Sequence, residues 1–180
     1  KTERIGLLAM LKNEKEIYTT RDVSFEIAPK INATGRVGKA SNAVKLLIED
    51  DETKIESLLG IIEQDNKKRR LIQDQVSLEA MVQAESIIKE NPEINSLVLY
   101  AENWHPGVIG IVASKIVDRF KRPCAVLSIK DEVAKGSLRT SNDINLFEVL
   151  KDCKSSLIQF GGHAGAAGIT IKTSEINNFK

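Results

Sequence analysis

The residues best placed to do chemistry in this chain are Gly161 to Gly168, Gly-Gly-His-Ala-Gly-Ala-Ala-Gly, where small residues surround one imidazole. Glycine permits positive φ and has no Cβ, so successive backbone N–H groups can converge on an anion. His163 can add a hydrogen bond or a positive charge. The segment predicts a glycine-rich phosphate cradle with Gly161, Gly162 and His163 at the ligand. A tight turn packed against a strand is the alternative.

A second candidate group is Lys135 to Ser141, which falls at the end of an expected strand over 133–139. Arg139 can bind a phosphate through two parallel hydrogen bonds, which lysine cannot do. Ser137 or Thr140 can donate to the same phosphate oxygens. The alternative is an arginine that forms a surface salt bridge.

The third group, Asn103 to Gly107, lies between an expected strand at 96–101 and an expected helix at 107–120. Unpaired N–H groups and partial positive charge gather where a strand meets a helix N-terminus. His105 is therefore a candidate for contact with phosphate, and Trp104 for stacking on a base. In the alternative, His105 caps the turn and Trp104 fills a gap in the core.

The fourth group is Ala28 to Gly38, which places Asn32 and Arg36 four residues apart among small residues, before an expected helix at 40–48. Its length and irregularity favour a binding loop over an ordinary loop with a helix cap.

Missing catalytic clusters, the net charge, the cysteines and the lengths of the apolar runs exclude several classes of protein. No paired carboxylates, no nucleophile beside a base and no metal-ligand cluster stand out, so a complete hydrolase site with its own metal ions is not expected. The net charge of +1 excludes a strong global attraction for nucleic acid. Cys124 and Cys153 lack metal-ligand spacing and indicate thiols in a reducing cytoplasm. No apolar run reaches the roughly 18 residues of a membrane span, so we expect a cytoplasmic protein without a membrane partner.

The pattern of apolar residues predicts an α/β protein in two halves. The first half is helical, and residues 51–91 contain no proline, which predicts one long connecting helix or two in tandem. The basic run Lys67 to Arg70 in this stretch is either a solvated helix face or a contact to DNA. After Pro92, strands and helices alternate, which predicts a small α/β domain with a mixed β-sheet.

Taken together, these blocks resemble the RecJ-type single-strand-specific DNA exonucleases of the DHH phosphoesterase superfamily. The resemblance rests on four ordered segments: Ala28 to Arg36, Trp104 to Lys115, Gly136 to Thr140 and Phe160 to Gly168. It implies a C-terminal fragment of such an enzyme. Residues 1–50 would be the end of the DHH domain with a hinge loop, 51–92 the long connecting helix, and 93–180 the DHH-associated domain that binds nucleic acid.

By the same resemblance, the full-length enzyme would degrade single-stranded DNA in the 5′-to-3′ direction during repair and recombination. Mn²⁺ or Mg²⁺ would be held by an N-terminal domain that this sequence lacks, so the fragment alone is expected to hold no metal and to be inactive. Arg139, Ser137 and His163 would bind phosphate, Asn32 and Arg36 would line the hinge, and His105 would lie near the cleft. A helicase and a single-strand-binding protein are further candidate partners.

Two alternatives stay open at this point. One is a nanoRNase-like phosphodiesterase of the same superfamily that acts on dinucleotides or short oligonucleotides. The other is a non-catalytic nucleic-acid-binding module. Leu138 departs from the family pattern, in which a small residue is common between the serine and the arginine, and this difference bears on how Arg139 is presented.

Overall fold

The computed structural model describes residues 4–11, 15, 17–140 and 144–180. They belong to two compact units, residues 1–71 and 72–180, and the long helix α5 contributes its first part to unit 1 and the rest to unit 2. The elements of unit 1 are α1 (Ile5–Leu8), α2 (Thr20–Asp22), a π-helical turn (Val23–Ile27), α3 (Ala28–Val37), α4 (Ala40–Ile48) and the start of α5 (Glu52–Glu90). Those of unit 2 are the remainder of α5, β1 (Leu97–Glu102), α6 (Ile109–Phe120), β2 (Cys124–Lys130), β3 (Val133–Arg139), α7 (Leu146–Asp152), β4 (Leu157–His163), β5 (Ala166–Lys172) and α8 (Ile176–Phe179), with 3₁₀ turns at Lys154–Ser156 and Thr173–Glu175. No helix in the described part of the chain is long and apolar enough to cross a membrane.

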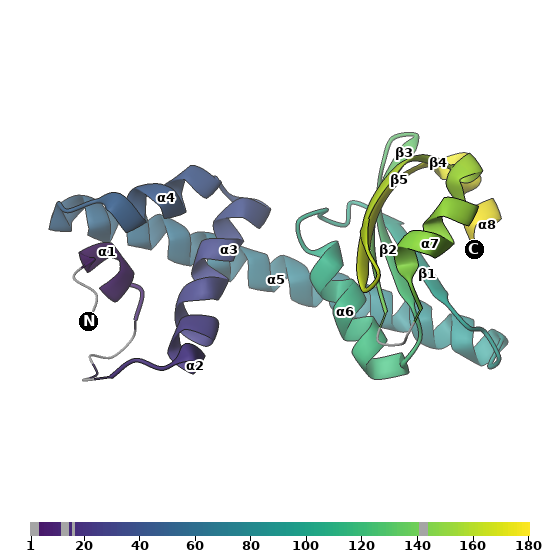
Figure 1. The fold of residues 1–180 in the computed structure, drawn as a ribbon, viewed down its shortest axis with the longest axis horizontal. Coiled ribbons are helices and arrows are strands. Elements are labelled where there is room, and N and C mark those ends of the chain that lie inside the picture. Colours follow the sequence, from purple (N-terminus) through teal and green to yellow (C-terminus); the bar gives the residue numbers. More distant parts are fainter. Residues whose placement is uncertain (1–3, 12–14, 16, 141–143) are drawn as a thin grey trace. The chain divides into compact units, whose positions relative to one another are not determined.

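Unit 1 is built from helices around a small apolar core (Figure 1). The core side chains come from α4 and α5, from the π-helical turn and from the segment after α1: Met10, Ile27, Ala43, Leu46, Ile55 and Ile62. Lys30 ties two parts of the unit together, because its ammonium group donates to the Met10 carbonyl at 2.8 Å and to Glu63 at 2.9 Å.

The prediction of a binding loop over residues 28–38 is wrong, since Ala28–Val37 form helix α3 and Gly38 follows its end. Pro29 is the second residue of α3, and because the π-helical turn Val23–Ile27 continues directly into this helix, the proline removes one backbone N–H donor from a continuous helical run. Ala33 and Thr34 are buried against the rest of the unit. Tertiary packing therefore outweighs the low helix propensity of Asn32 and Gly35.

A π-helical turn precedes α3 directly. The Ala28 N–H donates to the Val23 carbonyl, five residues back rather than four. The run of helices begins at a capping box in which the Thr19 hydroxyl accepts from the Asp22 N–H and the Asp22 side chain accepts from the Thr19 N–H. Asp22 also accepts from the Lys15 ammonium at 2.5 Å, and these bonds lower the pKa of its carboxyl to about 2.

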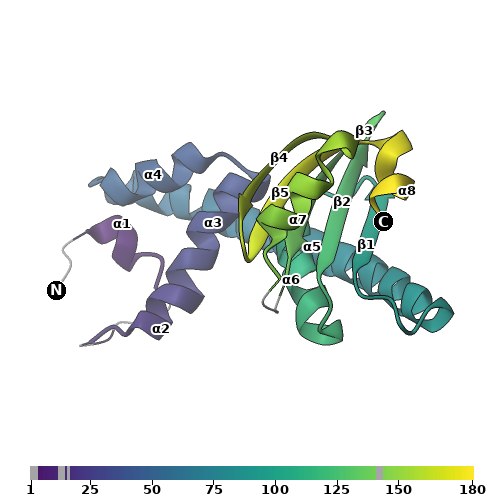
Figure 2. The same cartoon turned by 45° about the vertical axis from the view of Figure 1, so that its right-hand side comes forward.

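Unit 2 contains a mixed five-stranded sheet with strand order β1-β2-β3-β5-β4 (Figure 2). β1 and β2 are parallel, and the other neighbouring pairs are antiparallel. The α/β fold with a small mixed sheet, predicted from the sequence, is confirmed. The helical pattern expected over 51–91 is one helix, α5.

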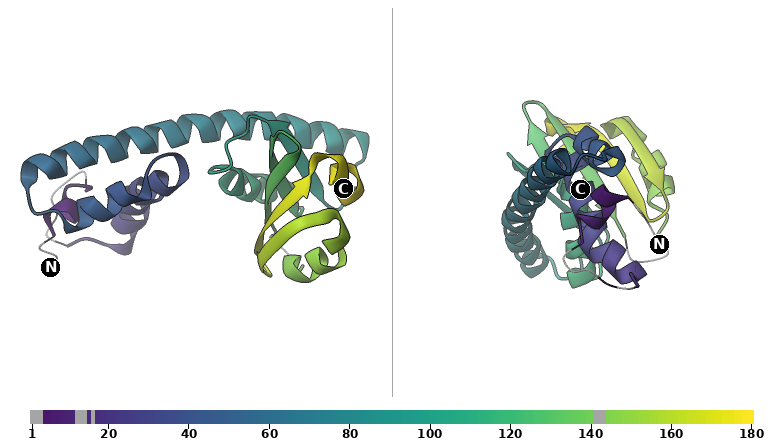
Figure 3. Two further views of the ribbon diagram at one scale, coloured as in Figure 1. Left: turned by 90° about the horizontal axis from the view of Figure 1, so that it is seen from above. Right: turned by 90° about the vertical axis from the view of Figure 1, so that its left-hand side faces the viewer.

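Helices cover both faces of this sheet (Figure 3). One face, called here the α6 face, packs on α6 and the second part of α5, with Ala80, Leu99 and Val112 in the shared core. The other, called the α7 face, packs on α7 and α8, with Leu138, Leu150 and Ile171 in its core. Successive residues of a strand point to opposite faces, so the register of the sheet assigns each side chain to one face.

The glycine cluster is a β-hairpin rather than a loop. Gly161, Gly162 and His163 end β4, a strand that the sequence pattern did not predict, and β5 begins at Ala166. Glycine is a poor strand former, and its place here is explained by pairing with β5 along the whole segment. Ser141, which belonged to the second candidate group, lies outside the described residues.

Candidate nucleic-acid interface

The sheet register brings two of the predicted phosphate ligands into one row. Arg139 on β3 pairs with Ala166 on β5, and Ala166 pairs with His163 on β4. Directly paired residues share a face, and neighbouring strands lie about 4.8 Å apart, so Arg139 and His163 flank Ala166 across about 10 Å of the α6 face. A small residue thus separates a cation from an imidazole.

The next row forms the floor between these side chains. Ser137 pairs with Gly168, and Gly168 pairs with Gly161, so two glycines lie side by side next to a hydroxyl. Gly161 and Gly168 are both exposed. α6 packs on β2 and β3 of this face, whereas α7 packs on β4 and β5 from the opposite side. The glycine-floored part of the α6 face is therefore open to solvent within unit 2.

The Arg139 side chain is held in place on this face. One terminal nitrogen donates to the Ser137 hydroxyl at 2.9 Å and to the Leu138 carbonyl at 2.7 Å. The guanidinium also lies against the first turn of α6, because a Cβ built on Gly110 would come within 3.1 Å of its other terminal nitrogen and 3.0 Å of the Ser137 hydroxyl. The side chain of Leu138 points to the α7 face and is buried there, so this departure from the family pattern leaves Arg139 on the α6 face.

The His163 ring is oriented by the turn of its hairpin. Its Nδ1 accepts a hydrogen bond from the Gly165 N–H at 3.2 Å. A neutral imidazole that accepts at Nδ1 carries its proton on Nε2. His163 is exposed, so this Nε2–H can donate to a ligand on the open face.

The two glycines of the Gly161-Gly162 pair differ in their surroundings. A Cβ on Gly161 would meet no atom within 4 Å, and one on Gly168 would meet only the Gly136 carbonyl at 3.8 Å. By contrast, Gly162 has φ +148° and a Cβ there would lie 2.4 Å from the Ala166 carbonyl oxygen. Gly162 is thus required by the hairpin itself, whereas Gly161 leaves the floor of the open face without a side chain.

The segment that carries His105 is held at the end of the α6 face away from Arg139, beside Ser128 and its register partner Lys135. Trp104 is buried, and its indole N–H donates to the Glu79 carboxylate at 2.6 Å. Its carbonyl accepts from the Ser128 hydroxyl. Trp104 is therefore a core residue and not a base-stacking side chain.

His105 repeats the geometry of His163. Its Nδ1 accepts from the Gly107 N–H at 3.0 Å, so its proton also lies on Nε2. Helix α6 begins at Ile109, two residues later than the sequence predicted. The structure brings His105 to the side of the sheet that α6 covers, but not into the row of Arg139 and His163.

Asn32 and Arg36 belong to unit 1. They lie one turn apart on α3 and are both exposed, so they share a face of that helix. Their role at a hinge stays a prediction.

The described residues do not fit a metal centre. Nowhere among them do three or more His, Cys, Asp or Glu side chains gather closely enough to hold a metal ion. The hydrogen-bond donors of the α6 face, from the half-buried Arg139 and Ser137 and the exposed His163, suit an anion instead.

Sequence reasoning missed two residues that shape this interface. Gly110 makes room for Arg139, and Glu79 accepts the hydrogen bond that holds Trp104. Gly110 could have been found as a small residue in the first turn of an apolar helix. Glu79 carried no local signal, because 25 positions separate it from its partner.

Comparison with known proteins agrees with this architecture. Residues 93–180 match the DHHA1 domain family, and this range lies within unit 2. The single-stranded-DNA-specific exonuclease RecJ of Bacillus subtilis is 39% identical over all of this chain, and that of Haemophilus influenzae is 32% identical over 98% of it. The crystal structure of Thermus thermophilus RecJ in complex with Mg²⁺ superposes with a TM-score of 0.88 at 30% identity over 99% of the chain.

The chain belongs to the RecJ family. It spans 23% and 32% of the length of the two curated relatives and 27% of the Thermus chain.

Proposed function

We propose that this chain forms the strand-holding surface of a single-stranded-DNA-specific exonuclease. The observation that carries the proposal is the open row of Arg139, Ala166 and His163 beside the paired glycines Gly161 and Gly168. The names of the relatives supply the substrate, single-stranded DNA, and the reaction, exonucleolytic hydrolysis. Degradation in the 5′-to-3′ direction is part of the proposal and comes from the family resemblance.

The row suits a backbone phosphate for chemical reasons. The Arg139 guanidinium, oriented by the Ser137 hydroxyl and the Leu138 carbonyl, has the planar fork of N–H groups that matches two phosphate oxygens. The Nε2–H of His163 can donate from the other side. Gly161 and Gly168 in the neighbouring row let the strand approach the sheet backbone closely. None of these contacts reads a base, so the surface holds strands without regard to sequence.

In our proposal, the metal ions of the reaction are bound by a part of the enzyme outside this chain. Thermus RecJ was crystallised with Mg²⁺ and with Mn²⁺, and a divalent ion would activate water and neutralise phosphate charge. Because the described residues do not gather a ligand set, we assign no step of the reaction to a metal held by this chain. The proposed parts are the end of a DHH domain at 1–50, a connecting helix at 51–92 and the nucleic-acid-binding domain at 93–180.

Binding measurements on the 180-residue chain test the proposal. We expect a fluorescent single-stranded octanucleotide to bind, with an affinity that falls as salt rises. Arg139→Ala and His163→Ala should each weaken binding by about 1–3 kcal/mol through loss of a charge-assisted hydrogen bond. Lys154→Ala is the matched control, since Lys154 is exposed in the 3₁₀ turn that follows α7.

Two results would contradict the proposal. One is an affinity that neither the Arg139 nor the His163 variant changes. The other is efficient Mn²⁺-dependent digestion of the oligonucleotide by the chain alone, because that would require a metal centre within it.

A further inference from the structure

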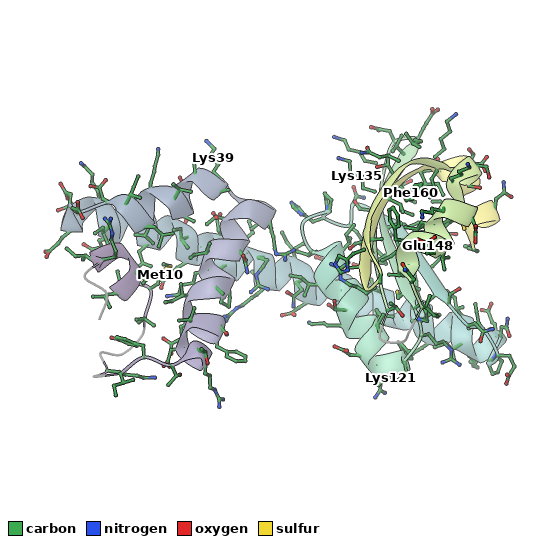
Figure 4. The ribbon with its side chains drawn as sticks, in the orientation of Figure 1. Met10, Lys39, Lys121, Lys135, Glu148 and Phe160 are labelled. Atoms are coloured by element: carbon green, nitrogen blue, oxygen red, sulfur yellow. The ribbon has the colours of Figure 1, made fainter. Side chains whose placement is uncertain are left out.

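The α6 face carries a third row of polar side chains that the proposed phosphate site does not use. Lys135 on β3 pairs with Thr170 on β5, and Thr170 pairs with Gln159 on β4. Lys135 and Gln159 are exposed and Thr170 is half-buried. In Figure 4, Lys135 lies on the α6 side of the sheet and Glu148 on the α7 side.

This row shares its face with the first one. Lys135, Ser137 and Arg139 alternate along β3, so all three side chains belong to the α6 face. Lys135 lies four positions before Arg139 on the strand, which corresponds to about 13 Å. The floor between the two rows is the Gly168 and Gly161 pair. A chain that follows this face therefore meets a cation, a glycine floor and a second cation.

The chemistry of the third row matches a second phosphate rather than a base pair. An ammonium group is a point charge with three donors, and a neighbouring hydroxyl and amide can each donate one more hydrogen bond. The row resembles the first in composition: one cation from β3, one small or short side chain from β5 and one polar donor from β4.

The end of the α6 face near Lys135 is also the end at which a hydrogen bond holds the segment that carries Trp104 and His105. Ser128 pairs with Lys135 across β2 and β3, and its hydroxyl donates to the Trp104 carbonyl. His105 follows Trp104 directly, so the rigid segment that carries this imidazole is fixed beside the third row. The sheet thus offers hydrogen-bond donors at both ends of the glycine floor.

We propose that Lys135, with Thr170 and Gln159, holds a second backbone phosphate of the bound strand, more than one nucleotide away from the phosphate at Arg139. This inference rests on the proposed function and adds the path of the strand along β3, β5 and β4. It makes the grip on the strand depend on its length, because a dinucleotide that occupies the Arg139 row does not reach Lys135.

The experiment compares two lengths of ligand on the 180-residue chain. Dissociation constants for a 5′-phosphorylated dinucleotide and octanucleotide would be measured by displacement of a labelled strand in EDTA, for Lys135→Gln, Thr170→Val, Arg139→Gln and the control Lys154→Gln. We expect Lys135→Gln to weaken octanucleotide binding about three- to tenfold and to lower the salt slope by about 0.7, with the dinucleotide unchanged. Thr170→Val should weaken octanucleotide binding less, in the same direction.

The outcomes separate the two proposals. If Arg139→Gln weakens both ligands while Lys135→Gln weakens neither, the second phosphate position is wrong and the proposed function stands. Equal weakening of both ligands by Lys135→Gln would place Lys135 in the first phosphate position and also overturn the inference. If Arg139→Gln and Lys135→Gln both leave both affinities unchanged, the strand-holding function itself fails. Circular dichroism of each variant, matched to that of Lys154→Gln, ensures that only folded proteins are compared.

Discussion

The two faces of the β4–β5 hairpin differ in composition, because one is apolar and packed and the other is polar and floored by glycine. On the α7 face, Phe160 contacts Phe147 with ring centroids 5.9 Å apart, and Ala167 and Ile169 are buried. On the α6 face, Gly161 and Gly168 pair with no side chain above them. The glycines of this segment are therefore needed for different reasons, because a Cβ on Gly161 would face open space and one on Gly162 would clash with the backbone.

The largest expected effect is a loss of stability when a side chain is added at Gly162, where the hairpin is tightly packed. Gly162→Ala would place a methyl group 2.4 Å from the Ala166 carbonyl oxygen in a backbone region with φ +148°. We expect a loss of about 3 kcal/mol in the free energy of unfolding, from strain and overpacking together. Urea denaturation of the 180-residue chain measures it. An unchanged midpoint would show that the hairpin tolerates a side chain there and would remove the distinction between the two glycines.

A second effect concerns how the covered part of the α6 face is held. Glu79→Ala would leave the buried Trp104 indole N–H without its acceptor, at a cost of about 1–3 kcal/mol. Glu79→Gln keeps a carbonyl acceptor and should retain most of the stability. The measurement is thermal unfolding followed by tryptophan fluorescence, since Trp104 is the single tryptophan. Equal stability of the two variants would mean that this hydrogen bond does not hold the segment.

Substitutions of the glycines on the open α6 face should lower the affinity for the strand and leave the stability of the chain unchanged. Gly161→Ala and Gly168→Ala add a methyl group where the structure has space, so the free energy of unfolding should stay within about 0.5 kcal/mol of the parent. Strand binding should weaken about fivefold, because the backbone of the floor can no longer be approached closely. Fluorescence anisotropy with a labelled octanucleotide measures the affinity. Full affinity in both variants would indicate that no ligand lies on this floor.

The smallest expected effect concerns the Cys124 thiol, which we expect not to be alkylated in the folded chain. Cys124 lies on the same face as Arg139, its register partner, but under α6, and burial raises the pKa of its thiol to about 12. The thiolate is the reactive form, so iodoacetamide at pH 8 should leave Cys124 unmodified in the native chain. Because the folded state raises this pKa, the contribution of the thiol to stability is lost as pH rises above about 9 toward 12.

A probe on the open part of the same face completes this test. Gly161→Cys should be alkylated readily, and bound oligonucleotide should protect it. Mass spectrometry of the peptides distinguishes the sites. Rapid modification of Cys124 would show that α6 does not cover its strand as described.

The sequence predicted the parts of this fold that depend on local pattern. The periodic apolar residues of 109–120 and the alternation over 133–139 indicated α6 and β3 correctly. The missed elements have weak local signals: α3 contains Pro29 and Gly35, and β4 contains Gly161 and Gly162, so both elements depend on packing and pairing with distant residues. The residue types of the candidate site could be named from the sequence, but the rows could not, because strand register is set by long-range pairing.

The π-helical turn at Val23–Ile27 has a consequence for insertions and deletions. Each residue of an α-helix turns the chain by about 100° about the helix axis, and the extra residue of the turn fixes how α3 is rotated relative to α2. Loss of a single residue there would present a different pair of side chains in place of Asn32 and Arg36. The spacing between Thr19 and Pro29 should therefore tolerate substitution more readily than any change in its length.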